Sequence, residues 1–270
     1  MQHIKAAQSY LFVPGQRPDR FAKAAASGAD EIILDLEDAV GPDMKDQARA
    51  NILDWFAQGG TGIVRINSHD APWYCDDLAA LRDSQCTALM VPKADPISLA
   101  RVAAEAPDKP LIALVETAAG IAGLRDSIMQ RGVTRLAFGN LDFGADMRLP
   151  AGGSVLDHAR YEIVLASRLG NLPRPIDGVT TDLKSTSAIT ADVQHARALG
   201  FGAKLCIHPA QISAVAQGFF PAPIEIDWAT RLLTALKDAA GAAVQIDGKM
   251  VDKPLIDRAR QILQDAEVTG

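Results

Sequence analysis

The chain has few cysteines, and their spacing indicates neither a set of disulfides nor a zinc site. Only Cys75, Cys86 and Cys206 occur in 270 residues, which is an odd number without the close spacing of a zinc site. Disulfides are rare in the reducing compartments of the cell. The sequence therefore predicts a protein of a reducing compartment that is held together by packing alone.

Two further absences narrow the class of protein. No apolar run approaches the roughly 20 residues that cross a membrane, and the first residues, MQHIKAAQSYLFVPG, lack the apolar core and cleavage site of a signal peptide. We therefore expect a cytoplasmic protein with no membrane partner. The formal net charge of -6 lacks the basic surplus that binds nucleic acid, so a nucleic-acid partner is not expected. A phosphorylated small molecule stays possible, because a few local Arg and Lys residues suffice for it.

The chain does contain a regular alternation of short apolar runs and amphipathic stretches. The runs are rich in Val, Ile and Leu, and the stretches between them, such as 17–27 and 189–200, place apolar residues at helical spacing. Near-continuous apolar strands with helices between them indicate a parallel sheet covered on both faces. The expected strands are residues 9–13, 31–36, 62–66, 87–91, 111–115, 134–138, 175–179 and 203–207.

Eight such units favour a closed barrel. The predicted fold class is α/β, a (β/α)8 TIM barrel with a C-terminal helical arm. An open doubly wound sheet is the structural alternative, and it would usually carry a glycine-rich phosphate turn after its first strand. That turn reads VPGQRP here, which favours the barrel.

The residues beyond the eighth unit form a separate segment. FFPAPIE (219–225) is Pro-rich and is typical of a linker. It leads into two stretches of helical spacing, 227–243 and 253–266. We therefore predict a barrel domain over residues 1–218 and a C-terminal helical arm over residues 219–270.

Polar residues follow the expected strands at their carboxyl ends, where a (β/α)8 barrel carries its active site. Oxygen ligands without Cys or His favour Mg²⁺ or Mn²⁺ over zinc. Glu116 and Asp142 follow neighbouring strands, so both can reach one ion, and waters and the oxygens of a ligand such as a 2-oxo acid would complete its shell. The polar residues at this rim are Asp35, Glu37, Asp38, Arg65, Asn67, Lys93, Glu116, Asn140, Asp142, Thr180, Asp182 and His208.

The chain contains, in this order, SYLFVPGQRPDRF, ILDLEDAV, VRIN, VPK, LVETAAGI, GNLDFGADM, CIHPAQI and DGKMVDKP. Together these segments resemble the citrate lyase beta-subunit-like branch of the HpcH/HpaI aldolase family, from about residue 9 to residue 263. That branch includes citryl-CoA, malyl-CoA and citramalyl-CoA lyases. The resemblance implies a Mg²⁺-dependent carbon–carbon lyase that cleaves a 3-hydroxy acyl-CoA into acetyl-CoA and a 2-oxo acid.

The resemblance also implies roles for the rim residues. Glu116 and Asp142 would be the Mg²⁺ ligands, and Glu116 would also contact substrate. Arg65 of VRIN would hold the oxygens of the oxo acid and stabilise the charge on the oxygen that becomes a carbonyl. Glu37 and Asp38 of LEDAV would take part in catalysis by accepting hydrogen bonds from metal-bound water.

Two positions outside the rim bear on the reaction. Asp252 of DGKMVD resembles an acidic residue that the family's C-terminal arm delivers into a neighbouring subunit's site. It would act as the acid/base at the acetyl carbon, which implies a homotrimer or hexamer. At position 8 many relatives have Arg before SxLFVPG, and this chain has Gln8. This departure bears on any anion contact made there, and through it on the acyl-CoA substrate.

Simpler roles and rival reactions stay open at this point. Glu116 could pair with a barrel lysine, Asp142 could cap a helix, and Asp252 could cap the last helix. The rival functions are a metal-independent Schiff-base aldolase on Lys93 or Lys204, a malate synthase or thioesterase acting on the same thioesters, and a non-catalytic ligand-binding homologue. The acyl chain, and the choice between CoA and an acyl-carrier thioester, are open as well.

Overall fold

The computed structural model describes residues 2–149, 153–183, 185–238 and 245–268. The chain divides into two compact units, Met1–Ala216 and Gln217–Gly270. Among the helices described, none combines the length and the apolar content that spanning a lipid bilayer requires.

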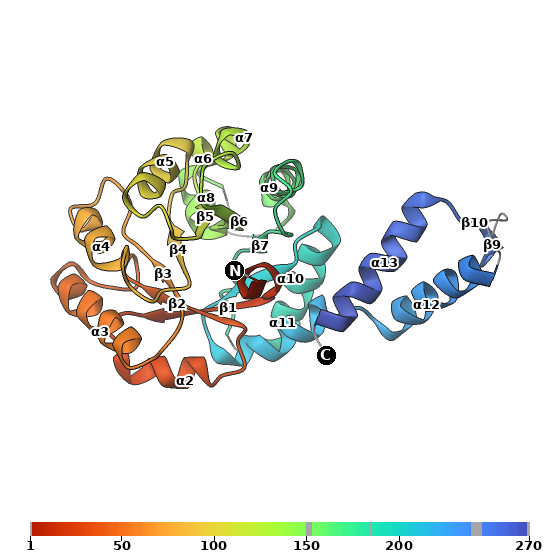
Figure 1. Ribbon diagram of the computed structural model, residues 1–270, viewed down its shortest axis with the longest axis horizontal. Helices are drawn as coiled ribbons and strands as arrows, with labels where there is room; N and C mark the ends of the chain where they lie inside the picture. Colours follow the sequence, from red (N-terminus) through yellow and green to blue (C-terminus); the bar gives the residue numbers. More distant parts are fainter. Residues whose placement is uncertain (1, 150–152, 184, 239–244, 269–270) are drawn as a thin grey trace. The chain divides into compact units, whose positions relative to one another are not determined.

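The first unit contains a closed barrel of eight strands (Figure 1). Every neighbouring pair is parallel, the strands follow chain order, and β1 pairs with β8 to close the ring. The predicted (β/α)8 fold is confirmed. The strands are β1 (Ser9–Pro14), β2 (Glu31–Asp35), β3 (Ile63–Arg65), β4 (Ala88–Val91), β5 (Leu111–Val115), β6 (Val133–Phe138), β7 (Ile176–Asp177) and β8 (Ala203–Cys206).

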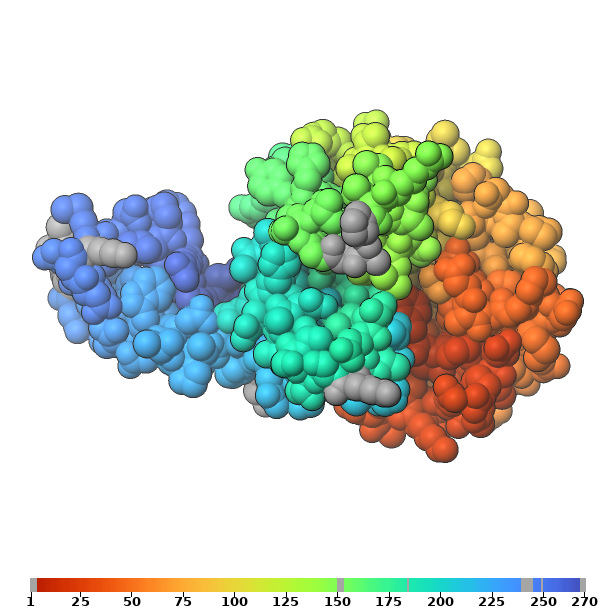
Figure 2. All heavy atoms as spheres, turned by 180° about the vertical axis from the view of Figure 1, so that it is seen from behind, coloured from red at the N-terminus to blue at the C-terminus, as the bar shows by residue number. Residues whose placement is uncertain are grey.

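Helices between the strands cover the barrel from outside (Figure 1), and the space-filling view shows their side chains as a continuous surface (Figure 2). Local sequence sets several of their ends: Asp95 and Ser98 form a reciprocal capping box at the start of one helix, and Gly200, in the left-handed conformation, ends another. The α-helices are α2 (Phe21–Ala25), α3 (Lys45–Ala57), α4 (Tyr74–Leu81), α5 (Pro96–Glu105), α6 (Ala118–Ala122), α7 (Leu124–Ser127), α8 (Asn140–Asp146), α9 (Asp157–Leu169), α10 (Thr186–Leu199) and α11 (Ile212–Phe219). Short 3-10 helices are Pro18–Arg20, Pro42–Met44, Ser154–Leu156 and Pro209–Gln211.

The inside of the barrel is a packed core. Alternate residues of each strand point inward, so Ile33 lies level with Ile63, and Ile63 with Ala88, in adjacent strands. A short helix that the sequence analysis did not predict, α1 (Gln2–Ala6), places Ile4 in the same core. The interior is therefore filled, and in barrels of this kind the active site lies at the carboxyl end of the strands. The core residues are Ile4, Ala7, Tyr10, Ile33, Ile63, Ala88, Met90, Ile112, Leu114, Ala137, Ile176, Ala203 and Leu205.

The second unit is a helical hairpin with its own small core. Its helices are α12 (Pro223–Asp238) and α13 (Lys253–Val268), and β9 (Gln245–Ile246) pairs antiparallel with β10 (Lys249–Met250). The buried core is Ala229, Leu232, Ala259 and Ile262.

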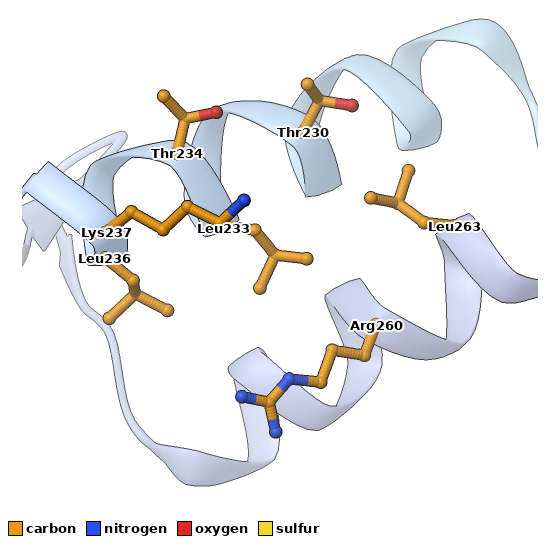
Figure 3. A pocket seen from close by; sticks show the side chains of 7 residues that line it. All are labelled: Thr230, Leu233, Thr234, Leu236, Lys237, Arg260 and Leu263. Carbon is orange, nitrogen blue, oxygen red and sulfur yellow. The ribbon is translucent and has the colours of Figure 1, made fainter.

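A hollow of about 470 Å³ opens between the two helices of this unit. Leucine side chains from both helices point toward it, and the cationic side chains of Lys237 and Arg260 flank it (Figure 3). The expected linker 219–225 is shorter than predicted, because α12 already begins at Pro223. Proline is favoured in the first turn of a helix, where its missing N–H costs no hydrogen bond.

Candidate active site

An arginine and an aspartate pair at the carboxyl rim of the barrel. Asp35 ends β2 and Arg65 ends β3, and they are register partners. Ile33 and Ile63 are core residues two positions earlier, so both charged side chains point to the inner side as well. Two parallel hydrogen bonds of 2.7 Å run from Nε and Nη2 of Arg65 to the two oxygens of Asp35. The pair is buried, which fixes the guanidinium in one orientation.

Arg65 also contacts the segment that follows β2. Its Nη1 lies 3.0 Å from Oε2 of Glu37 and 3.4 Å from Oδ2 of Asp38, and its guanidinium lies over the ring of Phe12, 4.8 Å from the centroid. Burial alone would lower the pKa of Arg65, but the charges of Asp35, Glu37 and Asp38 raise it, so the guanidinium stays charged.

Glu37 keeps one oxygen available. The 3.0 Å approach of Arg65 to Oε2 is an ion pair without the alignment of a hydrogen bond, and this buried oxygen has no hydrogen-bond partner in the described part of the chain. Burial raises the pKa of Glu37 to about 7. A buried acceptor without a donor is costly, so a bound group with a hydrogen to donate would be favoured beside it.

Glu116 follows β5 directly and is almost fully buried. Its Oε1 accepts a 2.7 Å hydrogen bond from the backbone N–H of Lys93. Its Oε2 lies against Gly139, where an added Cβ would come within 2.4 Å of that oxygen, so only glycine at position 139 leaves room for this carboxylate. Burial, followed by the negative charge of Glu37, raises the pKa of Glu116 to about 8. A cation at this place would remove much of that penalty.

Asp142 lies in the first turn of α8, after β6, and its side chain is exposed. Its charge is one of those that raise the pKa of Glu116. The two carboxylates line one cavity of about 330 Å³ together with Arg65 and Asp38. A second hollow of about 310 Å³ shares Asp38 with this cavity and is also lined by Glu37 and Lys93. The complete lining of the first cavity is Phe12, Asp35, Asp38, Ala39, Arg65, Leu114, Glu116, Gly139, Asn140, Leu141, Asp142, Val179, Leu205 and Ile207.

The donor set fits a hard divalent cation. No group of three or more His, Cys, Asp or Glu residues placed to hold a metal occurs in the described ranges. Mg²⁺ commonly takes only one or two protein carboxylates and fills its other positions with waters and ligand oxygens. Glu116 and Asp142, facing one cavity, meet that requirement.

Neither lysine proposed for a Schiff base has the setting that such chemistry needs. Lys204 of β8 is buried, and its Nζ donates to Oδ2 of Asp177 at 3.1 Å and to the carbonyl of Gly178 at 2.7 Å. The side chain of Lys93 is about half exposed, with Nζ 3.7 Å from Oε1 of Glu37. Burial tends to lower the pKa of Lys93, but the charges of Glu37 and Glu116 raise it. A Schiff-base lysine requires the opposite shift.

Three other rim residues form hydrogen bonds with neighbouring segments of the chain. The Thr180 hydroxyl donates to Asp192 at 2.6 Å, and Asp182 accepts from the N–H of Ser185. The ring of His208 accepts from the N–H of Ala210 and thereby caps the short helix Pro209–Gln211. These contacts stabilise the segments after β7 and β8. None of the three residues lines the 330 Å³ cavity.

Gln8 and Asp252 are the two positions outside the rim that the sequence analysis singled out. Gln8 immediately precedes β1, and its carbonyl accepts from the N–H of Lys204, which places it at the amino end of the barrel. Gln8 is therefore at the opposite end of the barrel from the cavity lined by Glu116 and Asp142. Asp252 belongs to the second unit, where it is exposed and its Oδ1 accepts from the N–H of Leu255 at 3.2 Å, capping α13.

The structure adds three residues that the sequence analysis did not single out. Phe12 supports the guanidinium of Arg65, and Gly139 gives space to Glu116. Lys45 is buried and donates to the carbonyls of Leu36 and Glu37 at 2.6 and 2.8 Å, which holds the segment carrying the rim carboxylates. The order strand–glycine–helix could have indicated Gly139, whereas no sequence signal distinguishes Lys45 from a surface lysine.

Comparison with known proteins identifies the family of this chain. Residues 8–209 match the family model described as HpcH/HpaI aldolase/citrate lyase. A citrate lyase subunit beta-like protein of Mycobacterium tuberculosis is 36% identical over 269 residues, 97% of this chain and 96% of the relative. A (3S)-malyl-CoA thioesterase of Cereibacter sphaeroides is 33% identical over 271 residues, 96% of this chain and 94% of the relative.

A solved structure extends the similarity to three dimensions. The crystal structure of CitE from Mycobacterium tuberculosis in complex with magnesium, acetoacetate and coenzyme A has a TM-score of 0.86 and 32% identity, covering 97% of this chain and 99% of that one. The similarity spans nearly the full length of both chains and includes both units described above. The resemblance seen in the sequence is confirmed, and the chain belongs to the HpcH/HpaI aldolase/citrate lyase family.

Proposed function

We propose that this protein is a Mg²⁺-dependent carbon–carbon lyase that cleaves a 3-hydroxy acyl-CoA into acetyl-CoA and a 2-oxo acid. Membership of a family of aldolases and citrate lyases supports an enzyme of the lyase class. The observation that carries the specific proposal is the convergence of Arg65, Glu116 and Asp142 on one cavity at the carboxyl rim. The magnesium, acetoacetate and coenzyme A bound to the similar CitE structure support it further.

In this proposal Glu116 and Asp142 hold the ion, and Glu116 also contacts the substrate. Glu37 and Asp38 accept hydrogen bonds from water bound to it, a role that suits the unpartnered Oε2 of Glu37. When bound, the ion supplies positive charge that polarises the oxygens of the oxo-acid part.

Cleavage is redox-neutral and involves two proton transfers that balance, one from the substrate hydroxyl and one to the enolate carbon. The hydroxyl gives its proton to solvent as its oxygen becomes the carbonyl of the 2-oxo acid, and the electron pair of the broken carbon–carbon bond passes to the thioester as an enolate. Arg65, oriented by its two hydrogen bonds to Asp35, would stabilise the oxygen that develops charge through its guanidinium. The enolate carbon then takes a proton, and we assign this step to Asp252 of a neighbouring copy in a homotrimer or hexamer.

A thioesterase is the second candidate, because the Cereibacter sphaeroides relative carries that activity in its name. The two candidates differ in which bond breaks and therefore in product. Incubation of the protein with malyl-, citramalyl- and citryl-CoA and Mg²⁺, followed by product analysis, separates them. Acetyl-CoA with a 2-oxo acid supports the lyase, whereas free CoA with an intact hydroxy acid supports the thioesterase. The same assay on an acyl-carrier thioester tests the choice of carrier.

The metal assignment has its own test. Glu116→Gln and Asp142→Asn remove one ligand charge each, so we expect either change to weaken Mg²⁺ binding by about 100-fold or more, measured by calorimetry. Asp108→Asn is the matched control, because Asp108 is an exposed carboxylate before β5, at the other end of the barrel. Unchanged Mg²⁺ affinity in both site variants would remove these residues from the metal site.

A further inference from the structure

Lys93 has a backbone conformation that residues other than glycine seldom adopt. Its φ is 47°, in the left-handed region, and it follows Pro92 just after β4. In turns of this kind proline precedes a position that glycine usually occupies. Lysine has neither the freedom of glycine nor the short polar side chain that lets Asn and Asp tolerate this region. Contacts around Lys93 must therefore stabilise its conformation.

The two ends of Lys93 contact two different carboxylates of the candidate site. Its backbone N–H donates to Oε1 of Glu116 at 2.7 Å. Its ammonium lies 3.7 Å from Oε1 of Glu37. The next residue, Ala94, returns to regular pairing through a 2.9 Å hydrogen bond from its N–H to the carbonyl of Leu114 in β5. The unusual conformation is thus confined to the one residue whose N–H reaches Glu116.

We propose that Lys93 is a positioning residue whose left-handed backbone holds the Glu116 carboxylate in place while its ammonium holds Glu37. The backbone role explains the conformation, because it turns the N–H toward Glu116 rather than toward a neighbouring strand. The side-chain role explains why the residue is lysine, because glycine would supply the same N–H without the charge. The inference rests on the proposed role of Glu116 as a metal ligand.

Three replacements of Lys93 separate the backbone role from the side-chain role. In Lys93→Gly the left-handed conformation is unstrained, and in Lys93→Met it carries the same conformational strain as with lysine. In Lys93→Ile the branched Cβ makes this conformation more strained. All three lack the ammonium, so differences among them report on the backbone alone. We expect the Gly and Met variants to bind Mg²⁺ within about threefold of each other and the Ile variant to bind about tenfold more weakly.

The ammonium is tested by activity under saturating Mg²⁺. The Met variant should keep its Mg²⁺ affinity and lose kcat by about tenfold or more, since Glu37 would lose one of its two cationic neighbours. Lys93→Arg, which retains a charge, should recover part of that kcat. A kcat of the Met variant equal to that of the unaltered protein would overturn the side-chain role.

Asn171 provides a matched control for backbone strain. It has φ of 51°, is exposed and follows α9, away from the candidate site. Asn171→Ile should lower the melting temperature relative to Asn171→Met, as at Lys93, but leave Mg²⁺ affinity unchanged. Equal Mg²⁺ affinities for the Ile and Met variants of Lys93 would overturn the backbone role. Failure of the unaltered protein to bind Mg²⁺ would instead overturn the proposed metal site, so the two failures are distinguishable.

Discussion

Arg65 is held at three sides by Asp35, Glu37 and the ring of Phe12. This arrangement depends on the planar, forked shape of the guanidinium as well as on its charge. We expect Arg65→Lys to keep the fold but to lower kcat/KM by about 100-fold and to weaken binding of pyruvate or oxaloacetate with Mg²⁺. Steady-state kinetics and calorimetry measure both effects. Near-normal kinetics in this variant, with an unchanged melting temperature, would exclude Arg65 from the mechanism.

Glu31 makes the stability of the fold depend on pH. It begins β2 at the amino end of the barrel, is 9% exposed, and burial followed by the charge of Asp30 raises its pKa from 4.5 to about 7. Between these values the folded state holds a proton that the unfolded state has lost, so this contribution to stability is complete below pH 4.5 and is lost as pH rises through 7.

Replacing the Glu31 carboxyl by an amide should remove this pH dependence of the free energy of unfolding. We expect Glu31→Gln to be more stable than the unaltered protein at pH 8 by roughly 1–3 kcal/mol and to differ little from it at pH 4.5. Denaturant unfolding at the two pH values measures the difference. An equal gain at both values would mean that the amide stabilises the fold for a reason other than ionisation.

For single residues, the sequence predicted which side chains lie at the carboxyl rim better than it predicted which atoms they contact. Glu116, Asp142 and Arg65 could be assigned to one rim because each follows or ends an apolar run, and parallel strands of a barrel end on the same side. Thr180 and His208 satisfy the same rule, yet the Thr180 hydroxyl donates to Asp192 of α10 and the His208 ring accepts from the N–H of Ala210. Which way a side chain turns depends on neighbours distant in sequence, and for this reason only the structure distinguishes the two groups.

At the scale of elements, the apolar runs predicted every strand of the barrel to within a few residues. The largest difference is β7, expected over 175–179 and found as Ile176–Asp177. Just after it, the carbonyl oxygen of Gly178 accepts a hydrogen bond from the side-chain ammonium of Lys204 rather than from a neighbouring strand. The helix α1 and the pair β9–β10 were not predicted. Both are short, and periodicity is a weak signal over so few residues.

The helix α1 is attached to the barrel through Arg135 of β6. The guanidinium is fully buried, and its Nη1 donates to the carbonyls of Ile4 and Ala7 and to the Tyr10 hydroxyl at 2.7–2.8 Å. Burial lowers the pKa of Arg135. A side chain without donors would remove the buried hydrogen bonds to the Ala7 carbonyl and the Tyr10 hydroxyl, whereas the Ile4 carbonyl would keep the hydrogen bond from Tyr10.

We therefore expect Arg135→Met to destabilise the fold by about 3–5 kcal/mol and to release α1, so that limited proteolysis cuts the chain before β1. Urea unfolding and mass spectrometry of the digests measure the two effects. Arg131→Met is the control, because Arg131 is exposed and only four residues away. If both variants unfolded alike and neither were cut near its amino end, α1 would not depend on this arginine.

At the scale of the whole molecule, the second unit has a core of its own and carries Asp252. The proposed reaction assigns this residue to the site of another copy, which predicts complementation. Mixing Asp252→Ala with Arg65→Ala under conditions that exchange subunits should restore a fraction of the activity, because some sites then combine an intact Arg65 with an intact Asp252. Each variant alone serves as the control. If exchange is demonstrated by mass spectrometry and the mixture stays inactive, the shared site is wrong.

The pairing of β1 with β8 has a consequence for synthesis. The ring closes only through contacts such as Ser9 with Lys204 and Leu11 with Cys206, so a growing chain cannot complete it until residues near 206 have left the ribosome. Until then β1 offers an unpaired edge to any other strand. Contacts this distant in sequence are also slow to form. We therefore expect a nascent chain whose synthesis pauses shortly before residue 206 to need a chaperone more than a chain that pauses after it.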